Sequence, residues 1–338
     1  MTRRLATALV GTGKWGRHIL RALCAIPTID LRLVVDTSAA ARQRALSLAP
    51  KVATTDDLAR AVGDPAIEAI VLATPAPTHA ELAIAALDAG KHVFVEKPLC
   101  MNMVEGEKIA RAALRANRQV MVGHLLLYHP AVQKLRNVVH AGELGTLRYL
   151  YATRVNLGTV RREENAWWSL APHDVSMILD LVGVLPVRIA AHGAAYLTPH
   201  VEDVVFAHLV FPGGIVASIH VSWLDPHKRR ELTVVGDRKM VCFDDVEPGE
   251  KLRIYDKGAD VHTEFTNFAE FVALRQGDVT IPRLDAIEPL QAQLEHFAAA
   301  MLASTEPRTS LASGLDVVRV LQAGQQSLDS GGLPITLV

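Results

Sequence analysis

The chain has 338 residues, about twice the ~150 of an ordinary domain, so two domains are expected. Half of the residues are hydrophobic and 21% are charged, which excludes a fibrous or intrinsically disordered chain and indicates a sizeable core. The 35 basic and 36 acidic residues leave a net charge of −1, so no overall field would draw the protein to nucleic acid or to an anionic membrane.

The cysteines and the apolar runs indicate the compartment. Cys24, Cys100 and Cys242 lie far apart and form neither a disulfide framework nor a zinc-site spacing, as expected in a reducing cytosol. The first apolar run, 5–10, is too short for an export signal, and no stretch reaches the ~18 apolar residues of a membrane span. We expect a cytoplasmic protein.

The first third of the chain alternates short apolar runs with helical periods. The apolar runs are continuous rather than alternating, so the strands should be buried on both faces of a parallel sheet that helices cover. Predicted strands are 5–10, 31–36, 69–74, 92–97 and 119–123, and predicted helices are 14–26, 38–49, 78–89 and 102–117. The sequence predicts a doubly wound α/β domain over residues 1–123.

After Gly123 the pattern changes to that of an α+β domain. In 215–224 apolar residues alternate with serine and histidine, which is typical of an antiparallel strand with one buried face. Further predicted strands are 146–156, 230–236, 239–245 and 251–256, and predicted helices are 130–140, 173–182, 285–303 and 313–329. We therefore expect residues 124–338 to form a second domain with a largely antiparallel open sheet.

A glycine-rich motif joins the first predicted strand to the first predicted helix. Its residues are Gly11, Thr12, Gly13, Lys14, Trp15 and Gly16. Between a strand and a helix, glycines with G-x-G-x-x-G spacing permit a tight turn and let backbone N–H groups approach a pyrophosphate. The motif therefore predicts dinucleotide binding by a Rossmann domain.

Asp36 ends the second predicted strand, 20 residues after Gly16. An acidic side chain at this spacing accepts hydrogen bonds from the adenosine ribose, and its charge would repel a 2′-phosphate. Thr37 and Ser38 supply no cation, although Arg42 lies about a turn later. NAD is therefore favoured over NADP. An additional role for Asp36 as the N-cap of the next helix stays open.

The most specific pattern lies within residues 73–106. It is Glu96-Lys97-Pro98, supported by Thr74-Pro75, Thr78-His79 and Ala89-Gly90-Lys91-His92-Val93. The segment resembles the glucose-fructose oxidoreductase / inositol dehydrogenase (Gfo/Idh/MocA) family, and the resemblance covers most of the chain. It implies a Rossmann domain followed by an α/β domain whose open sheet often forms an oligomer interface. We expect a homodimer or homotetramer.

The resemblance also implies two catalytic residues. Lys97 would lie near the nicotinamide and contact the oxidised hydroxyl, where an ammonium group stabilises alkoxide charge. His173 matches the family's histidine at the start of a helix, and a neutral imidazole can accept the hydroxyl proton. Ser169 and Ala171 depart from the family's aspartate and glycine, and Asp174 could orient His173 or complement the helix N-terminus. Further expected NAD contacts are Thr37, Thr74, Pro75, His79, Glu96 and Lys97.

Metal binding is the competing use of the histidines. His124, His129, His192 and His200 form no set at ligand spacing backed by carboxylates, so we expect no metal.

The loop 154–168 is rich in arginine and tryptophan, and it carries Asn156-Leu157-Gly158, Arg161, Asn165 and Trp168 ahead of Pro172-His173-Asp174. It resembles the branch of the family that oxidises nucleotide-activated amino sugars such as UDP-N-acetylglucosamine at C3. Expected substrate contacts are Lys97, Arg154, Asn156, Arg161, Asn165, Trp167 and His173. Guanidinium groups suit a diphosphate. The alternative is a surface loop pinned by buried tryptophans, with arginine–glutamate pairs outside.

These observations predict an NAD-dependent oxidoreductase that oxidises a secondary hydroxyl, at C3, of a nucleotide-activated sugar such as UDP-N-acetylglucosamine. An inositol or free-sugar dehydrogenase, a sugar 3-ketoreductase and a non-catalytic NAD-binding regulator share the architecture and stay open.

Overall fold

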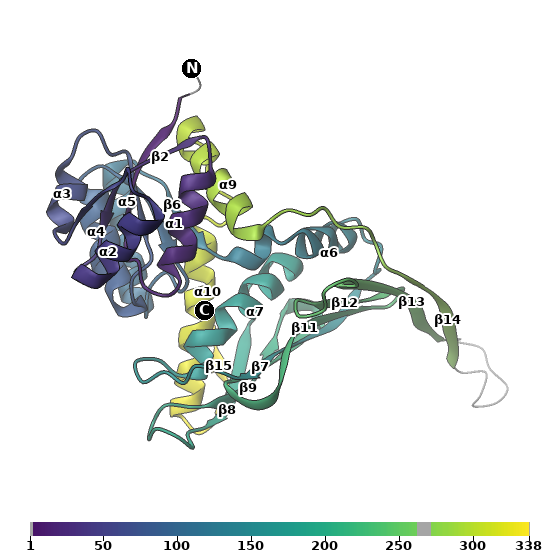
Figure 1. Ribbon diagram of the computed structural model, residues 1–338. Coiled ribbons are helices and arrows are strands. Elements are labelled where there is room, and N and C mark those ends of the chain that lie inside the picture. The colour runs from purple at the N-terminus through teal and green to yellow at the C-terminus, as the bar shows by residue number, and fades with distance from the viewer. Residues whose placement is uncertain (1–2, 262–271, 338) are drawn as a thin grey trace. The chain divides into compact units, whose positions relative to one another are not determined.

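The chain folds into two units, seen in a computed structural model that describes residues 3–261 and 272–337. Unit 1 consists of Met1–Tyr128 and Ile287–Arg319, and unit 2 of His129–Ala286 and Val320–Val338. This division differs from the single boundary expected after residue 123. The segment from Ile287 returns to unit 1 because α9 (Pro289–Ala303) packs against α1 (Gly16–Ala25) and β1 (Leu5–Val10) (Figure 1).

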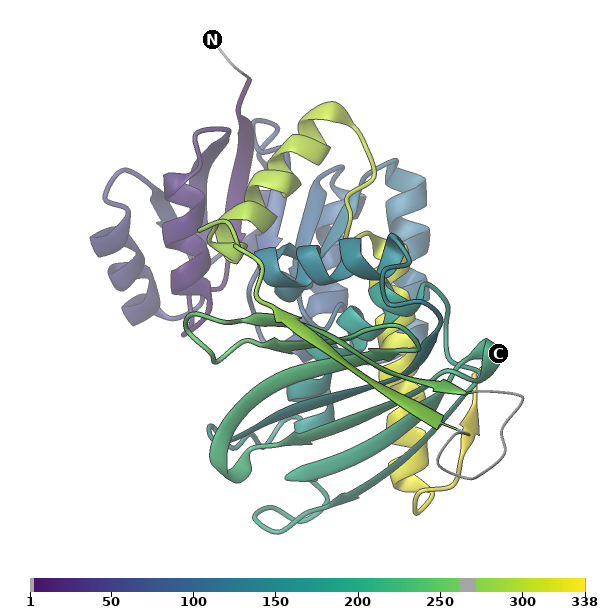
Figure 2. The same cartoon turned by 90° about the vertical axis from the view of Figure 1, so that its right-hand side faces the viewer.

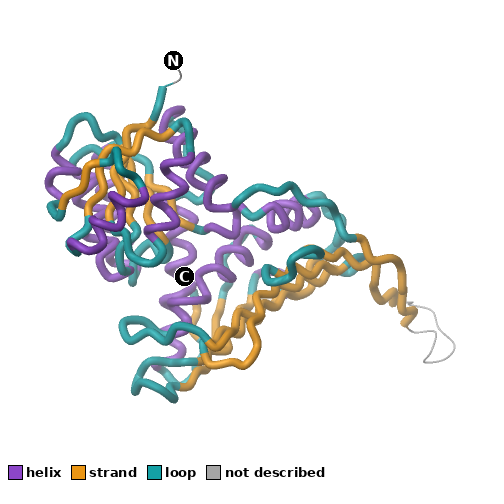
Figure 3. The backbone as a smooth tube through the Cα atoms, in the orientation of Figure 1, coloured by secondary structure: helices purple, strands orange, loops and turns teal. Residues whose placement is uncertain are grey.

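Unit 1 contains a parallel sheet of six strands in the order β3-β2-β1-β4-β5-β6, which confirms the predicted doubly wound sheet. Its helices lie on both sides of the strands (Figure 3). The strands after β1 are β2 (Ile29–Val35), β3 (Ala53–Thr55), β4 (Ala69–Leu72), β5 (His92–Glu96) and β6 (Val120–Gly123). The helices after α1 are α2 (Ala39–Leu48), α3 (Leu58–Gly63), α4 (His79–Asp88) and α5 (Met103–Ala116), with 3-10 turns at Ala76–Thr78 and Leu125–Tyr128. The short β3 and α3 were not predicted.

The core of unit 1 explains the continuous apolar runs. Every residue of β1 and of β4 is buried, as expected for strands covered by helices on both faces. Phe94 of β5 meets Phe297 of α9 edge to face, with ring centroids 5.6 Å apart. Such contacts hold helix α9, from late in the chain, against a sheet formed by the first third of the chain.

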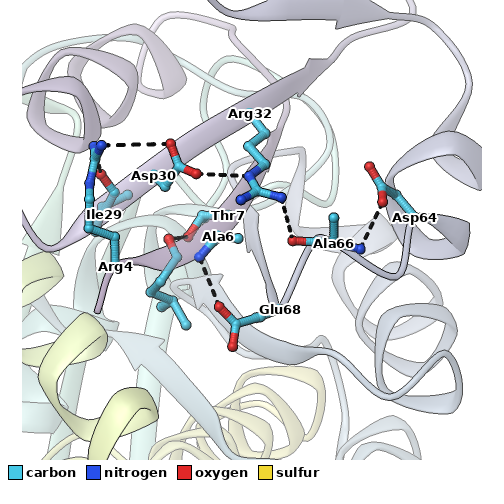
Figure 4. A network of polar contacts seen from close by, with 10 residues as sticks. Arg4, Ala6, Thr7, Ile29, Asp30, Arg32, Asp64, Ala66 and Glu68 are labelled. Atoms are coloured by element: carbon cyan, nitrogen blue, oxygen red, sulfur yellow. Dashed lines mark hydrogen bonds and ion pairs between the residues drawn. The ribbon is translucent and has the colours of Figure 1, made fainter. Parts of the chain in front are cut away.

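A polar network holds the amino-terminal ends of the strands in unit 1 (Figure 4). Arg32 donates from Nε to Asp30 at 2.8 Å and from Nη1 to the carbonyl oxygen of Ala66 at 3.0 Å. Glu68 accepts from the backbone N–H of Ala6 at 3.2 Å. These bonds link β1, β2 and the segment before β4. The opposite edge, at the carboxyl ends of the strands, is where doubly wound sheets bind ligands.

Unit 2 contains a sheet of nine strands in the order β14-β13-β12-β11-β7-β10-β9-β8-β15. Most neighbours are antiparallel, which confirms the predicted open sheet, but β10 pairs with β7 in parallel and with β9 in antiparallel orientation. Its strands are β7 (Leu147–Leu157), β8 (Arg188–Ala194), β9 (Val204–Val210), β10 (Val216–Ser222), β11 (Leu224–Gly236), β12 (Met240–Asp244), β13 (Leu252–Val261), β14 (Val272–Thr280) and β15 (Ile335–Thr336), with a 3-10 turn at Pro212–Gly214.

Helices cover one face of this sheet. They are α6 (Pro130–His140), α7 (Ala166–Val182) and the C-terminal part of α10 (Leu311–Asp329), as Figures 1 and 2 show. Ala217, Ile219 and Val221 of β10 are buried beneath them. On the other face, to which no helix of the described chain is applied, Tyr151 of β7 and Phe206 of β9 are exposed. The alternation predicted for 215–224 is therefore present.

Candidate active site

The glycine-rich loop of unit 1 has the shape that a dinucleotide requires. Gly11 has φ +91°, and a Cβ there would lie 2.6 Å from the carbonyl oxygen of Ala73. A Cβ on Gly16 would lie 2.2 Å from the carbonyl oxygen of Gly11, whereas a Cβ on Gly13 would meet nothing within 4 Å. The first and third glycines therefore permit the turn and its packing, and the second leaves open space where a pyrophosphate can approach.

Asp36 presents an ordered carboxylate beside this loop. Its Oδ2 accepts from the backbone N–H and the hydroxyl of Thr12, both at 2.8 Å, and its Oδ1 accepts from the N–H of Ser38 at 2.9 Å. Partial burial raises the pKa of Asp36, but these bonds and the charge of Arg42 outweigh it and hold the pKa below its ordinary value. The carboxylate is therefore ionised at neutral pH, as an acceptor for ribose hydroxyls must be.

Two neighbours of Asp36 have structural tasks. Ser38 is the N-cap of α2 and accepts from the N–H of Ala41 at 3.3 Å, so the N-cap role left open for Asp36 belongs to Ser38. Arg42 donates to the carbonyl oxygens of Asp36 at 2.7 Å and of Thr37 at 3.1 Å. Its guanidinium holds this turn in place, and it also lies 3.3 Å from the carboxylate of Asp56.

The carboxyl ends of β4 and β5 bring the remaining expected cofactor residues to the same edge. Thr74 and Pro75 follow β4, and the half-buried Lys97 follows Glu96 at the end of β5, with a cis peptide between Lys97 and Pro98. Burial raises the pKa of Glu96 to about 7, against the opposing effects of a hydrogen bond from the Trp15 side chain and the charge of Lys97. The indole of Trp15, in the glycine-rich loop, is thus hydrogen-bonded to the Glu96-Lys97-Pro98 turn.

His124, directly after β6, was considered only as a metal ligand in the sequence. It is buried, and neither ring nitrogen has a hydrogen-bond partner in the described part of the chain. Burial and the nearby charge of Lys97 lower its pKa to about 4, so the ring is neutral. The Gly-His pair at the end of a predicted parallel strand was a signal that could have placed it at this edge.

His173 lies within α7 of unit 2, where it is half-buried. The expectation that it begins a helix is wrong. The helix begins at Ala166, because Asn165 caps it by accepting from the N–H of Trp168 at 3.1 Å. The expected start came from the resemblance to the family's histidine pattern, whereas Pro172 and His173 both lie inside the helix.

The partner of Asp174 is now clear. Arg154 of β7 donates to its carboxylate through Nε at 2.8 Å and through Nη2 at 2.9 Å, a bidentate pair. The side chains are 6% and 0% exposed. Asp174 is neither at the N-terminus of α7 nor at its cap. The pair attaches α7 to β7 at the residue next to His173. It also occupies two nitrogens of the Arg154 guanidinium group, which was expected to contact substrate.

Two other residues expected to contact substrate serve the interior of unit 2. Asn165 donates from Nδ2 to Glu202 at 2.6 Å and to Gln325 at 2.9 Å. Trp167 is fully buried, and its Nε1 donates to the carbonyl oxygen of Leu321 at 2.9 Å. For these two side chains, the arrangement matches the alternative of a loop pinned by buried residues.

Arg161 and Asn156 remain at the surface of the loop. The Arg161 side chain is 50% exposed and lies 3.0 Å from the carboxylate of Glu164, the local neutralisation that the sequence had suggested. Asn156, near the end of β7, is half-buried. Both side chains are partly accessible to solvent, whereas Arg154, Asn165 and Trp167 are buried and held by protein partners.

Two further properties concern the described residues as a whole. Residues 3–261 and 272–337 contain no group of three or more histidine, cysteine, aspartate or glutamate side chains arranged to hold a metal ion. Within the same ranges, every helix is too short or too polar to cross a bilayer.

Known proteins contain domains similar to each of the two units. A sequence model of the oxidoreductase family with an NAD-binding Rossmann fold matches residues 5–124, and one of the GFO/IDH/MocA C-terminal domain matches 132–242. An oxidoreductase structure from Magnetospirillum magnetotacticum MS-1 is 30% identical, with a TM-score of 0.80 over 94% of this chain and 99% of that one. The chain belongs to the Gfo/Idh/MocA oxidoreductase family. Unit 1 is its NAD-binding domain, and NAD is its cofactor.

Relatives within the Gfo/Idh/MocA family differ in substrate. The UDP-N-acetylglucosamine 3-dehydrogenase of Acidithiobacillus ferrooxidans is 28% identical over 95% of this chain and 96% of its own length. The scyllo-inositol 2-dehydrogenase of Bacillus subtilis is 22% identical over all of this chain and 97% of its own. The chain is thus an oxidoreductase with sugar and inositol dehydrogenases among its relatives.

Proposed function

We propose that this protein is an NAD-dependent dehydrogenase that oxidises a secondary hydroxyl of a nucleotide-activated sugar, at C3 of UDP-N-acetylglucosamine or a close analogue. One observation carries the dehydrogenase proposal. The Glu96-Lys97-Pro98 turn lies at the same strand edge as the glycine-rich loop and Asp36, so unit 1 joins a cofactor site to a lysine suited to alkoxide chemistry.

The proposed chemistry divides between two side chains. Bound NAD supplies the hydride acceptor. The ammonium group of Lys97 donates a hydrogen bond to the reacting oxygen and stabilises its developing negative charge. The imidazole of His173 accepts the hydroxyl proton. Ser176 donates to the carbonyl oxygen of His173 at 2.9 Å, and the buried Arg154–Asp174 pair fixes the next residue, so the backbone that carries this base is well held.

The substrate class rests on the relative that acts on UDP-N-acetylglucosamine and on Arg161. That side chain is half-exposed, and a guanidinium group suits a diphosphate. A second candidate, an inositol or free-sugar dehydrogenase, is favoured by the ion pairs Arg154–Asp174 and Arg161–Glu164, which reduce the positive charge available to an anionic substrate.

A substrate panel separates the two candidates. UDP-N-acetylglucosamine, related nucleotide sugars, free hexoses and inositols are compared at equal enzyme and NAD concentrations, with NADH absorbance as the readout. We expect oxidation of a nucleotide sugar, and expect Arg161→Ala to raise its KM by about tenfold while NAD binding stays unchanged. Arg162→Ala, a change at the neighbouring exposed arginine, is the matched control. Oxidation of free polyols alone would exclude the nucleotide-sugar proposal.

We further propose that the protein works in the cytoplasm as a homo-oligomer. Cys24, Cys100 and Cys242 are all free thiols, as suits a reducing compartment. The uncovered face of the nine-stranded sheet carries exposed Tyr149 and Phe206, which suit contact with a second copy of the chain.

A further inference from the structure

His79, expected to contact NAD, instead bridges two backbone segments of unit 1. It is the first residue of α4 and is only 1% exposed. Its Nδ1 lies 2.7 Å from the carbonyl oxygen of Pro98, and its Nε2 lies 2.9 Å from the carbonyl oxygen of Thr74. Both ring nitrogens therefore face backbone carbonyl oxygens, and the ring donates to one of them when it is neutral and to both only when it is protonated.

The two segments that His79 joins are those that form the strand edge of the proposed site. Thr74 follows β4, and its hydroxyl accepts from Thr78 at 2.8 Å. Pro98 follows Lys97 directly after β5. The backbone N–H of Lys97 donates to Glu96 at 3.3 Å, near the long limit of such bonds, whereas the His79 contact with Pro98 is short. The contact of His79 with Pro98 is thus shorter than the Lys97–Glu96 bond within the turn.

We propose that His79 is a positioning residue for Lys97. By holding the Pro98 carbonyl against the start of α4, it directs the ammonium group of Lys97 toward the reacting oxygen, and it makes no contact with NAD itself. The inference rests on the proposed catalytic role of Lys97. A displacement of about 1 Å in a catalytic group can lower the rate about 100-fold. Loss of the buried His79 contact with Pro98, one residue from Lys97, can therefore lower the rate measurably.

The two ring nitrogens of His79 can be replaced one at a time, which distinguishes a role in positioning Lys97 from a general structural role. The amide nitrogen of asparagine can occupy the position of Nδ1, and that of glutamine the position of Nε2, so each variant retains one donor. His79→Ala is expected to lower kcat by about 30-fold, with the Kd for NADH, measured by fluorescence titration, changed by less than about threefold. His79→Asn, which keeps the Pro98 bond, should restore most of kcat, and His79→Gln should restore little.

A double-mutant cycle locates the effect at Lys97. If His79 acts through Lys97, His79→Ala adds no further loss of kcat in a Lys97→Ala background. Equal losses in both backgrounds, or NADH binding weakened as much as kcat, would overturn the inference. If Lys97→Ala alone keeps full turnover, it is the proposed function that fails. His227→Gln, at an exposed histidine of unit 2, is the matched control and is expected to change nothing.

A measurement without substrate completes the test. The full-length protein is reductively methylated with ¹³C-formaldehyde, and the signal of Lys97 is assigned by its loss in Lys97→Arg. We expect this signal to shift or broaden in His79→Ala and to return in His79→Asn, with thermal melting confirming that each variant is folded. A Lys97 signal unchanged in folded His79→Ala would contradict the proposal, whichever sugar the enzyme oxidises.

Discussion

At the scale of single residues, Lys97 and His173 have distinct tasks in the proposed reaction. Lys97→Ala and His173→Ala should each lower kcat by about 100-fold or more, because each removes a charge or proton acceptor needed in the transition state. NAD affinity should stay within a few-fold. NADH absorbance and NADH fluorescence report the two quantities, and Lys134→Ala and His227→Ala, at exposed positions, serve as controls. Full turnover by either active-site variant would refute its assignment.

Asp36 determines a second prediction at this scale, the choice between NAD and NADP. The carboxylate is held ionised by Thr12, Ser38 and Arg42, so a 2′-phosphate would meet a negative charge and lose the ribose bonds. NAD should therefore bind considerably more tightly than NADP, and Asp36→Ala should narrow the difference. Titrating both cofactors checks this, with Asp88→Ala as a control. A wild-type preference for NADP would contradict it.

At the scale of elements, the attachment of α7 to β7 depends on the buried Arg154–Asp174 pair. Arg154→Met or Asp174→Asn leaves the other partner buried without its counter-charge, which should reduce the free energy of unfolding by about 3–5 kcal/mol. The double variant Arg154→Met/Asp174→Leu should recover part of the loss. Urea unfolding measures these changes. The exposed pair Arg115–Asp88 is the control, at under about 1 kcal/mol. A loss of under about 1 kcal/mol in the free energy of unfolding of Asp174→Asn would contradict the role of the Arg154–Asp174 pair in attaching α7 to β7.

At the scale of the whole molecule, the uncovered face of the nine-stranded sheet predicts self-association. Phe206 stacks on His220 with ring centroids 4.2 Å apart, and the exposed Tyr149 and Tyr151 continue the same surface. Light scattering at micromolar concentration should give a dimer or tetramer, and Phe206→Glu should shift it toward monomer because a charge would be buried in the interface. Leu114→Glu, an exposed change on α5, should not. A monomeric wild-type protein would overturn this prediction.

The residues predicted for the cofactor site came from spacing within short segments. The turn at Gly11 and the carboxylate of Asp36 belong to a local strand–turn–helix geometry that recurs in dinucleotide-binding domains. A short sequence pattern is therefore sufficient to predict these two features. His79 was predicted from the sequence to contact NAD, and in the structure its ring nitrogens lie beside two backbone carbonyl oxygens. Its acceptors, Thr74 and Pro98, are 5 and 19 residues away, and only the folded chain brings them together.

By itself, the sequence determined that unit 1 contains a parallel sheet of buried strands, that 215–224 contains an alternating strand, and to which family the chain belongs. These properties depend on local periodicity and contiguous motifs. The tertiary structure alone decided that α9 belongs to unit 1, that α7 begins at Ala166 and that Asp174 pairs with Arg154. Each of these results from side chains distant in the sequence that meet in a core, where packing and charge pairing outweigh local preference.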